Sequence, residues 1–185
     1  MKKVELKEQE VVLGSLAHSI YIPSFSFGIF MLIITIALGY FGEWSDFYKS
    51  WLFGFMVAAG TSLGALIFVM LQFIVKAGWS VLVRRLAEAM AFNLKWIWIL
   101  FIPIVFIVLS GHGTLLYEWC DLEKMATDHV LHKKQSYLSP NFWVIRSFCY
   151  LLIWGIIANW YFKNSTAQDI TGDFNLTSRM EKYAP

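Results

Sequence analysis

The chain has 185 residues, of which 58% are hydrophobic and 15% are charged. This is far more apolar than a soluble domain of similar length, so the composition argues against a soluble globular class and indicates that lipid is the solvent. The formal net charge of +2 gives no basic field that could hold nucleic acid, which argues against that class of partner. Cys120 and Cys149 form no CxxC or zinc-ligand spacing, so we expect no metal, haem or cluster on this chain.

The first predicted span covers residues 21–41. A helix that rises 1.5 Å per residue needs about 20 apolar residues to cross a hydrocarbon core of about 30 Å, and this run has no charged residue. Residues 1–20 carry mixed charges rather than the basic start of a signal peptide, and no small-residue cleavage site follows the span. We therefore expect residues 1–20 to stay attached as an N-terminal segment.

The second predicted span, 51–75, is the longest. It contains a series of small residues, which are Gly54, Ala58, Gly60 and Gly64. Small residues let helix backbones approach closely in lipid, where burial between helices gives no hydrophobic driving force. We predict that these positions pack helices together, with an approach to a ligand as the alternative.

Polar residues gather where the second span ends. Gln72 and Lys76 lie one turn apart on the predicted helix and are candidates for a proton route or a quinone contact. The stretch 76–95 follows, with Arg84, Arg85 and Glu88 on one helical face and Leu82, Leu86 and Ala89 on the other. This separation predicts an amphipathic surface helix on which Arg84 and Arg85 contact anionic lipid or a partner subunit. The alternative is ordinary snorkelling and positive-inside charge.

The third predicted span, 91–110, begins near Ala91, and we expect Lys95 to snorkel to the headgroups. Its far end leads into a polar connection that contains His112, Tyr117 and Asp121. An imidazole beside a phenol and a carboxylate near the membrane surface could hydrogen-bond a quinol and accept its protons. The alternative is a capping or interfacial histidine among loop acids.

The fourth predicted span covers 142–162, and a polar tail follows at 163–185. Arg146 lies one turn inside the span, where we expect it to snorkel or to pair with a loop acid such as Asp121 or Glu123; the alternative is a buried counter-ion. Together the spans predict an all-α integral membrane protein: a four-transmembrane-helix bundle in residues 21–162, with an amphipathic helix on the inner membrane surface.

The positions of the basic residues predict the orientation, because cytoplasmic loops retain Lys and Arg. The N-terminal segment, the connection between spans two and three and the C-terminal tail hold ten of the 15 Lys and Arg residues. We therefore expect both ends of the chain to be cytoplasmic.

Two stretches of the sequence resemble a known membrane-protein family. Residues 53–90 read FGFMVAAGTSLGALIFVMLQFIVKAGWSVLVRRLAEAM, and residues 133–154 read KKQSYLSPNFWVIRSFCYLLIW. They resemble the F subunit of bacterial alternative complex III, a quinol:cytochrome c oxidoreductase. The small-residue span, the glutamine before AGWS, the basic pair and the closing EAM stand in the family's order.

The resemblance implies an auxiliary subunit of the bacterial inner membrane that holds no redox centre of its own. Its expected partners are lipids, a polytopic quinol-binding subunit, an iron–sulfur protein and cytochrome c subunits, and these proteins would carry the haem c and the iron–sulfur clusters. The subunit would act as a scaffold in the respiratory chain and could add a pathway for proton translocation or a secondary quinone contact to quinol oxidation and electron transport.

The chain departs from the family in two ways. The family's third span usually ends in a cluster of histidines, whereas His112 stands alone here. The family is also considerably longer, so we expect residues 163–185 to lead into further helices and the chain to be a fragment or a split subunit.

Other functions remain open at this point. The helix pattern also fits a membrane anchor or assembly subunit of a different oxidoreductase, of the polysulfide-reductase-like class. A small transporter would need charged or discontinuous helices at the bilayer midplane, and the predicted spans offer none.

Overall fold

The computed structural model describes residues 14–77 and 80–184, without the side chains of residues 14–17 and of Leu82. Every regular element in these ranges is a helix. Four helical runs are long and apolar enough to cross a membrane: His18–Phe41, Trp44–Ile74, Val83–Leu109 and Pro140–Thr171. The predicted all-α, four-span architecture is therefore confirmed, and the chain is a multi-pass membrane protein. The predicted segment 1–20 falls largely outside the described residues.

The chain divides into two compact units between Phe47 and Tyr48. The first unit holds α2 (Gly14–Phe41) and the first turn of α3. Nearly all described side chains of α2 are exposed, and a helix that is apolar all round suits a lipid environment. Gly39 lies against Phe47, whose side chain would be 3.1 Å from a Cβ at Gly39. The missing side chain thus lets the start of α3 lie close to α2.

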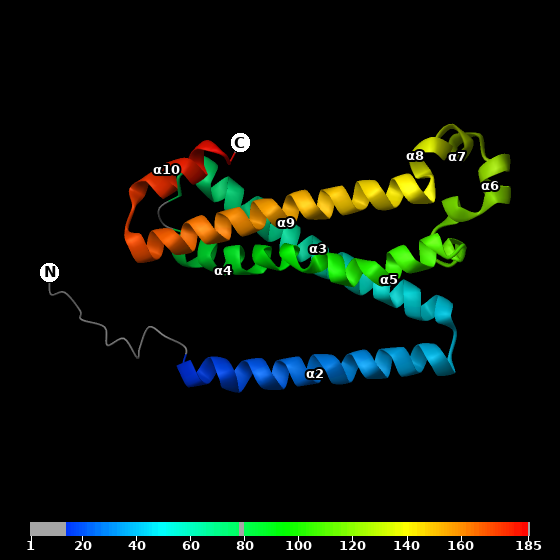
Figure 1. The fold of residues 1–185 in the computed structure, drawn as a ribbon, viewed down its shortest axis with the longest axis horizontal. Coiled ribbons are helices and arrows are strands. Elements are labelled where there is room, and N and C mark those ends of the chain that lie inside the picture. The colour runs from blue at the N-terminus through cyan, green and yellow to red at the C-terminus, as the bar shows by residue number, and fades with distance from the viewer. Residues whose placement is uncertain (1–13, 78–79, 185) are drawn as a thin grey trace, which may run out of the picture. The chain divides into compact units, whose positions relative to one another are not determined.

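The second unit, from residue 48 onward, holds most of α3 and all later elements (Figure 1). Its longer helices are α3 (Trp44–Ile74), α4 (Val81–Phe92), α5 (Ile97–Leu109), α9 (Pro140–Thr171) and α10 (Phe174–Lys182), and the short η1 (Asn93–Lys95) lies between α4 and α5. The connection from α5 to α9 consists of η2 (Gly113–Leu115), η3 (Glu118–Cys120), α6 (Leu122–Thr127), α7 (His129–Lys133) and α8 (Gln135–Leu138). We call the end where α4 begins and α9 finishes the ionic end, and the opposite end, residues 110–139, the loop end.

α9 is the helix that connects this unit, because it packs along α4, η1 and α5 in turn. Its closest approach is at Gly155, where a Cβ would lie 3.2 Å from the carbonyl oxygen of Leu94 in η1. α3 meets the other helices through large side chains instead. The Phe55 and Phe101 rings lie 5.4 Å apart, and the Phe73 and Tyr161 rings 5.5 Å apart.

The glycines of α3 do not make the predicted close contacts within the described chain. A Cβ at Gly54, Gly60 or Gly64 would meet nothing within 4 Å, whereas Ala58 is partly buried against the core. The physical reason is that these glycines are exposed, while α3 packs on its neighbours through Phe55 and Phe73. The predicted role of these glycines in packing against other subunits stays a prediction.

α4 turns its charged face toward the bundle. Leu86 and Ala89 are exposed, Arg84 and Arg85 are half-buried, and Glu88 is 2% exposed. The charged residues and the exposed Leu86 and Ala89 lie on opposite faces, as predicted, but the charged face points into the bundle instead of toward lipid headgroups because its charges neutralise one another. The run that forms the third candidate span begins at Val83 rather than near residue 91, so it takes in most of α4.

The C-terminal residues form a further helix rather than a plain polar tail. α9 continues to Thr171, and Gly172 ends it in the left-handed conformation with a φ of 66°. The Asp173 side chain then accepts a hydrogen bond from the backbone N–H of Asn175, which caps α10. Met180 of α10 is fully buried, so this helix closes the ionic end of the bundle.

Candidate functional site

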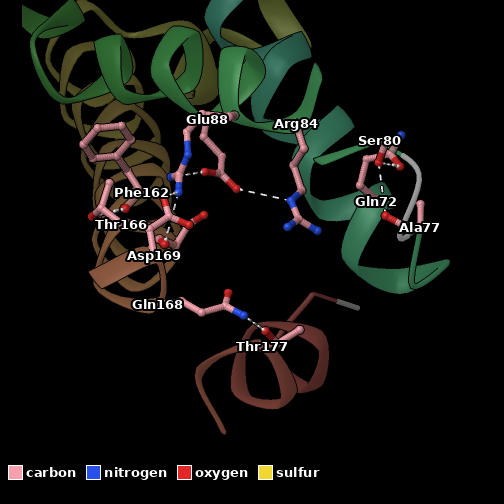
Figure 2. A network of polar contacts seen from close by, with 12 residues as sticks. Gln72, Ala77, Ser80, Arg84, Glu88, Phe162, Thr166, Gln168, Asp169 and Thr177 are labelled. Carbon is pink, nitrogen blue, oxygen red and sulfur yellow. Dashed lines mark hydrogen bonds and ion pairs between the residues drawn. The ribbon is translucent and has the colours of Figure 1, made fainter. Parts of the chain in front are cut away.

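Glu88 and Arg85 form an ion pair within α4 at the ionic end, and Figure 2 shows the polar cluster around them. Glu88 Oε2 accepts a hydrogen bond from Arg85 Nη1 at 2.8 Å. The residues are three positions apart, so their side chains meet on one face of the helix. The Glu88 side chain is only 1% exposed. Because an unpaired carboxylate is very costly to bury, this pair allows α4 to face the bundle.

Arg85 also joins α4 to α9. Its Nη2 donates a hydrogen bond to the backbone carbonyl of Ser165 at 3.2 Å and a second to the carboxylate of Asp169. Ser165 and Asp169 are one turn apart on α9, so both acceptors face the same guanidinium. This contact connects segments 84 residues apart in the sequence.

Arg84 completes the cluster from the other side of Glu88. Its Nε lies 3.6 Å from Glu88 Oε1, and its guanidinium carbon lies 4.6 Å from the centroid of the Phe73 ring. The longer distance is a Coulombic contact rather than a hydrogen bond. Oε1 is buried and has no hydrogen-bond partner among the described residues. The charges of Arg84, Arg85, Glu88 and Asp169 cancel, so the ionic cluster is neutral overall.

The predicted pair Gln72 and Lys76 separates at the end of α3. Gln72 is buried, and its Oε1 accepts a hydrogen bond from Ser80 Oγ at 2.8 Å. Lys76 is 73% exposed, and its Nζ lies 3.6 Å from Glu181 of α10. The prediction that Gln72 and Lys76 stand one turn apart on one helix is wrong. α3 ends at Ile74, and Lys76 adopts the left-handed conformation with a φ of 51°.

α10 is held to the same end by side-chain hydrogen bonds. Gln168 Nε2 donates to Thr177 Oγ1 (Figure 2). The Tyr161 hydroxyl donates to the carbonyl of Met180 at 3.3 Å. The ionic end thus joins the end of α3, α4, the end of α9 and α10. The structure brings together the predicted residues Gln72, Arg84 and Arg85 there, with Lys76 at the margin.

The predicted residues of the loop end do not form one site. His112 is exposed, and its Nδ1 lies 3.2 Å from the carbonyl oxygen of Ser110. Asp121 caps α6, where it accepts the backbone N–H of Glu123 at 3.0 Å. Among the described residues no hydrogen bond joins His112, Tyr117 and Asp121 to one another.

Arg146 finds an aromatic partner at the loop end. Its Nη1 donates to the carbonyl of Tyr137 at 3.1 Å, and its guanidinium carbon lies 3.6 Å from the centroid of the Tyr137 ring. The described residues contain no ion pair between Arg146 and Asp121, because the cation is already held by the segment that leads into α9. This cation–π contact replaces the predicted ion pair.

Tyr117 instead lines an apolar groove of about 320 Å³ between α3, α5 and α9. The aromatic walls of this groove are Phe55, Phe101, Tyr117, Trp143, Tyr150 and Trp154. The Tyr117 and Trp143 ring centroids are 5.4 Å apart. Burial raises the pKa of Tyr117 above its ordinary value, so its hydroxyl keeps its proton at neutral pH. We call this feature the aromatic groove; it can hold a flat ring and donate a hydrogen bond to a carbonyl.

No model of a known protein family matches the chain. A search of curated proteins finds no match either. The chemistry of this chain therefore rests on its residues and their geometry.

Several residues of these sites were not predicted from the sequence. They are Ser165 and Asp169 at the ionic cluster, and Trp143, Tyr150 and Trp154 in the aromatic groove. The groove residues recur at helical spacing along α9, so the periodicity of aromatic residues could have indicated a shared face. The contact of Asp169 with Arg85 carries no local signal, because it depends on how α4 and α9 pack.

Proposed function

We propose that the chain is an auxiliary membrane subunit of a bacterial quinol:cytochrome c oxidoreductase of the alternative complex III type. The observation that carries the proposal is the place of residues 53–90 in the fold. This stretch includes Val69, Phe73 and Glu88, which are among the most deeply buried side chains of the second unit. A resemblance in residues that build the core and the ionic cluster supports a shared bundle rather than a shared lipid-facing composition.

The surface beside α3 supports a role as a scaffold for other subunits. A second groove of about 730 Å³ lies between α3 and the α4–α5 run, with Gly54, Ala58 and Ser62 along its α3 wall. These small residues repeat every fourth position, so they share one face of the helix. Such a face suits close contact with another transmembrane helix.

The aromatic groove supports a secondary quinone contact. Its aromatic walls match a flat ring, and no described residue accepts a hydrogen bond from the Tyr117 hydroxyl. That hydroxyl, protonated at neutral pH, would hold a quinone by donating to one of its carbonyls. Electron transfer would take place on the haem- and cluster-bearing partners, and this chain would position and shield the ring.

The charge distribution supports the inner membrane as the location, with the ionic end on the cytoplasmic side. Arg84, Arg85, Lys163, Arg179 and Lys182 all belong to that end or to the segments that leave it. The ionic cluster would then lie at the cytoplasmic surface of the bundle, with Ser165 and Asp169 beyond the predicted span 142–162, where paired charges are tolerated.

Affinity purification from native membranes in a mild detergent tests this function. We expect the tagged chain to elute with polypeptides that carry haem c and iron–sulfur clusters, visible in the reduced-minus-oxidised spectrum and identified by mass spectrometry. Recovery of the chain alone would contradict the proposal. Partners of the polysulfide-reductase class without haem c would assign it to the alternative anchor function.

A further inference from the structure

A third groove lies between η1 and α9, away from both the ionic cluster and the aromatic groove. It has a volume of about 300 Å³. Its apolar part is formed by one face of α9, namely Phe148, Leu151, Leu152 and Ile156, together with Leu94 and Trp98. Its polar residues are Lys95 and Asn159. The groove is therefore amphipathic along its length.

Lys95 has no counter-ion within the described chain. Its Nζ lies 5.4 Å from the Phe92 ring centroid and 5.2 Å from that of Trp96, and no acidic side chain of the described residues pairs with it. A cation that lines an apolar groove in a membrane-spanning run requires an anion or water nearby. Lys95 thus gives the groove a positive charge that favours an anionic ligand.

Asn159 adds a hydrogen-bond donor to Lys95. Its Oδ1 is buried without a partner among the described residues, so Nδ2 is the polar atom of this side chain that a ligand can meet. An ammonium and an amide N–H₂ together present donors and no accessible side-chain acceptor. The matching ligand group is rich in acceptor oxygens and negatively charged, as a phosphodiester is.

The length of the groove matches one leaflet of a bilayer. From Phe148 to Asn159 α9 rises about 16 Å at 1.5 Å per residue. Half of a hydrocarbon core of about 30 Å is about 15 Å. Asn159 lies toward the ionic end of α9 and Phe148 toward the loop end, so the polar pair would sit at the headgroup level of one leaflet and the apolar face would reach the midplane.

We propose that this groove binds one glycerophospholipid of the leaflet on the ionic side. Lys95 and Asn159 hold the phosphate, and one acyl chain follows Leu152 and Ile156 toward the midplane. Gly155 and Leu94 approach each other closely at the base of the groove, so the bound lipid covers the contact between η1 and α9. This inference does not depend on the proposed respiratory function.

The test is lipid titration of the full-length chain, purified in detergent and stripped of lipid. Native mass spectrometry counts the phosphatidylglycerol molecules retained. We expect the wild type to retain one, and Lys95→Gln to bind it at least about tenfold more weakly, the effect of one lost charge-assisted hydrogen bond. Asn159→Leu should weaken binding about fivefold and provides an independent second variant.

The matched control is Lys163→Gln, which removes an exposed lysine one turn beyond Asn159 and outside the groove. It should bind phosphatidylglycerol as the wild type does. Diacylglycerol with the same acyl chains should bind at least about tenfold more weakly, because it lacks the phosphate. Equal binding by wild type, Lys95→Gln and Asn159→Leu would overturn the proposal. Equal binding of diacylglycerol, or displacement of the lipid by inorganic phosphate, would overturn it as well.

Discussion

Glu88 Oε2 lies 2.8 Å from Nη1 of Arg85, and both side chains point into the bundle from α4. The same guanidinium reaches Ser165 and Asp169 on α9, so one buried carboxylate and one arginine determine how the two helices meet. Charges within a membrane-spanning run are expensive, and they persist here because each has an opposite charge in contact. The ionic cluster therefore joins α4 to α9, and it is also the reason why the charged face of α4 points into the bundle.

Glu88→Gln should destabilise the protein strongly. The substitution leaves Arg84 and Arg85 without their shared carboxylate, and removal of one partner of a buried ion pair costs on the order of 3 kcal/mol. Thermal unfolding in detergent should show a clear fall in the melting temperature. The control is Glu181→Gln, which breaks the pair with the exposed Lys76 and should cost less than about 1 kcal/mol. Similar losses in both variants would show that burial of Glu88 does not matter.

Gly155→Ala should be harmful where Gly64→Ala is not. The added Cβ at Gly155 would lie 3.2 Å from the carbonyl oxygen of Leu94, and overpacking of this kind costs about 1–3 kcal/mol. Gly64 has no neighbour within 4 Å, so alanine there should be neutral or stabilise the helix by up to about 1 kcal/mol. Unfolding of the isolated chain measures both values, and a Gly155→Ala variant as stable as the wild type would contradict the observed packing.

Bulky residues at Gly60 or Gly64 should act on assembly rather than on the chain itself. Gly60→Leu and Gly64→Leu place a side chain at exposed positions of α3, so the isolated chain should keep its melting temperature. Gly60 also lines the aromatic groove, so Gly64→Leu is the variant that tests the packing surface alone. The yield of intact complex should fall if a partner helix packs there. An unchanged yield of complex would remove the predicted packing role of these glycines.

Cys120 should react with alkylating agents only at high pH. Burial raises the pKa of its thiol to about 11, and its Sγ lies against Gly113. In a Cys149→Ser background the alkylation rate should rise about tenfold per pH unit between pH 8 and pH 10, because only the thiolate reacts. A plateau by pH 9 would contradict the burial.

The raised pKa of Cys120 also gives the sign of a stability effect. The folded state binds the thiol proton more tightly than the unfolded state does. The stability contributed by this group is complete below the unfolded pKa, near 9, and is lost as the pH rises toward 11. Unfolding measured across this range should show a decrease that Cys120→Ala lacks.

Substitutions in the aromatic groove should affect quinol-linked turnover, and His112 should not. Trp143→Ala removes an aromatic wall of the groove, and Tyr117→Phe removes its hydroxyl group. We therefore expect each substitution to raise the KM for quinol a few-fold. His112→Ala removes an exposed ring whose hydrogen-bond partner among the described residues is Ser110, so it serves as the matched control. A larger effect at His112 than at Trp143 would place the quinol elsewhere.

Much of the fold follows from the sequence because lipid imposes a simple rule. The four apolar stretches had to become helices, since only helices satisfy their own backbone hydrogen bonds in hydrocarbon. The two faces of α4 also follow from spacing alone. Residue spacing alone does not predict the direction in which the charged face of α4 points. That direction depends on Asp169, which lies 84 residues away from Arg85 in the sequence.

The remaining differences have local or long-range causes that hydropathy does not report. Lys76 lies beyond the end of α3 in a left-handed conformation, and the sequence has no glycine at this position that would predict it. Arg146 prefers a carbonyl and an aromatic ring to a loop acid. Gly54, Gly60 and Gly64 of α3 lack close neighbours among the described residues because they lie at exposed positions, while the helix packs through its aromatic side chains.

The proposed function makes this chain part of a quinol-oxidising, cytochrome-reducing complex. The most direct measurement is quinol-dependent cytochrome c reduction in membranes of the source organism after deletion of this chain, with and without complementation. We expect the activity to disappear on deletion, to return with the wild type, and to return only weakly with Glu88→Gln. Unchanged activity in the deletion membranes would contradict it.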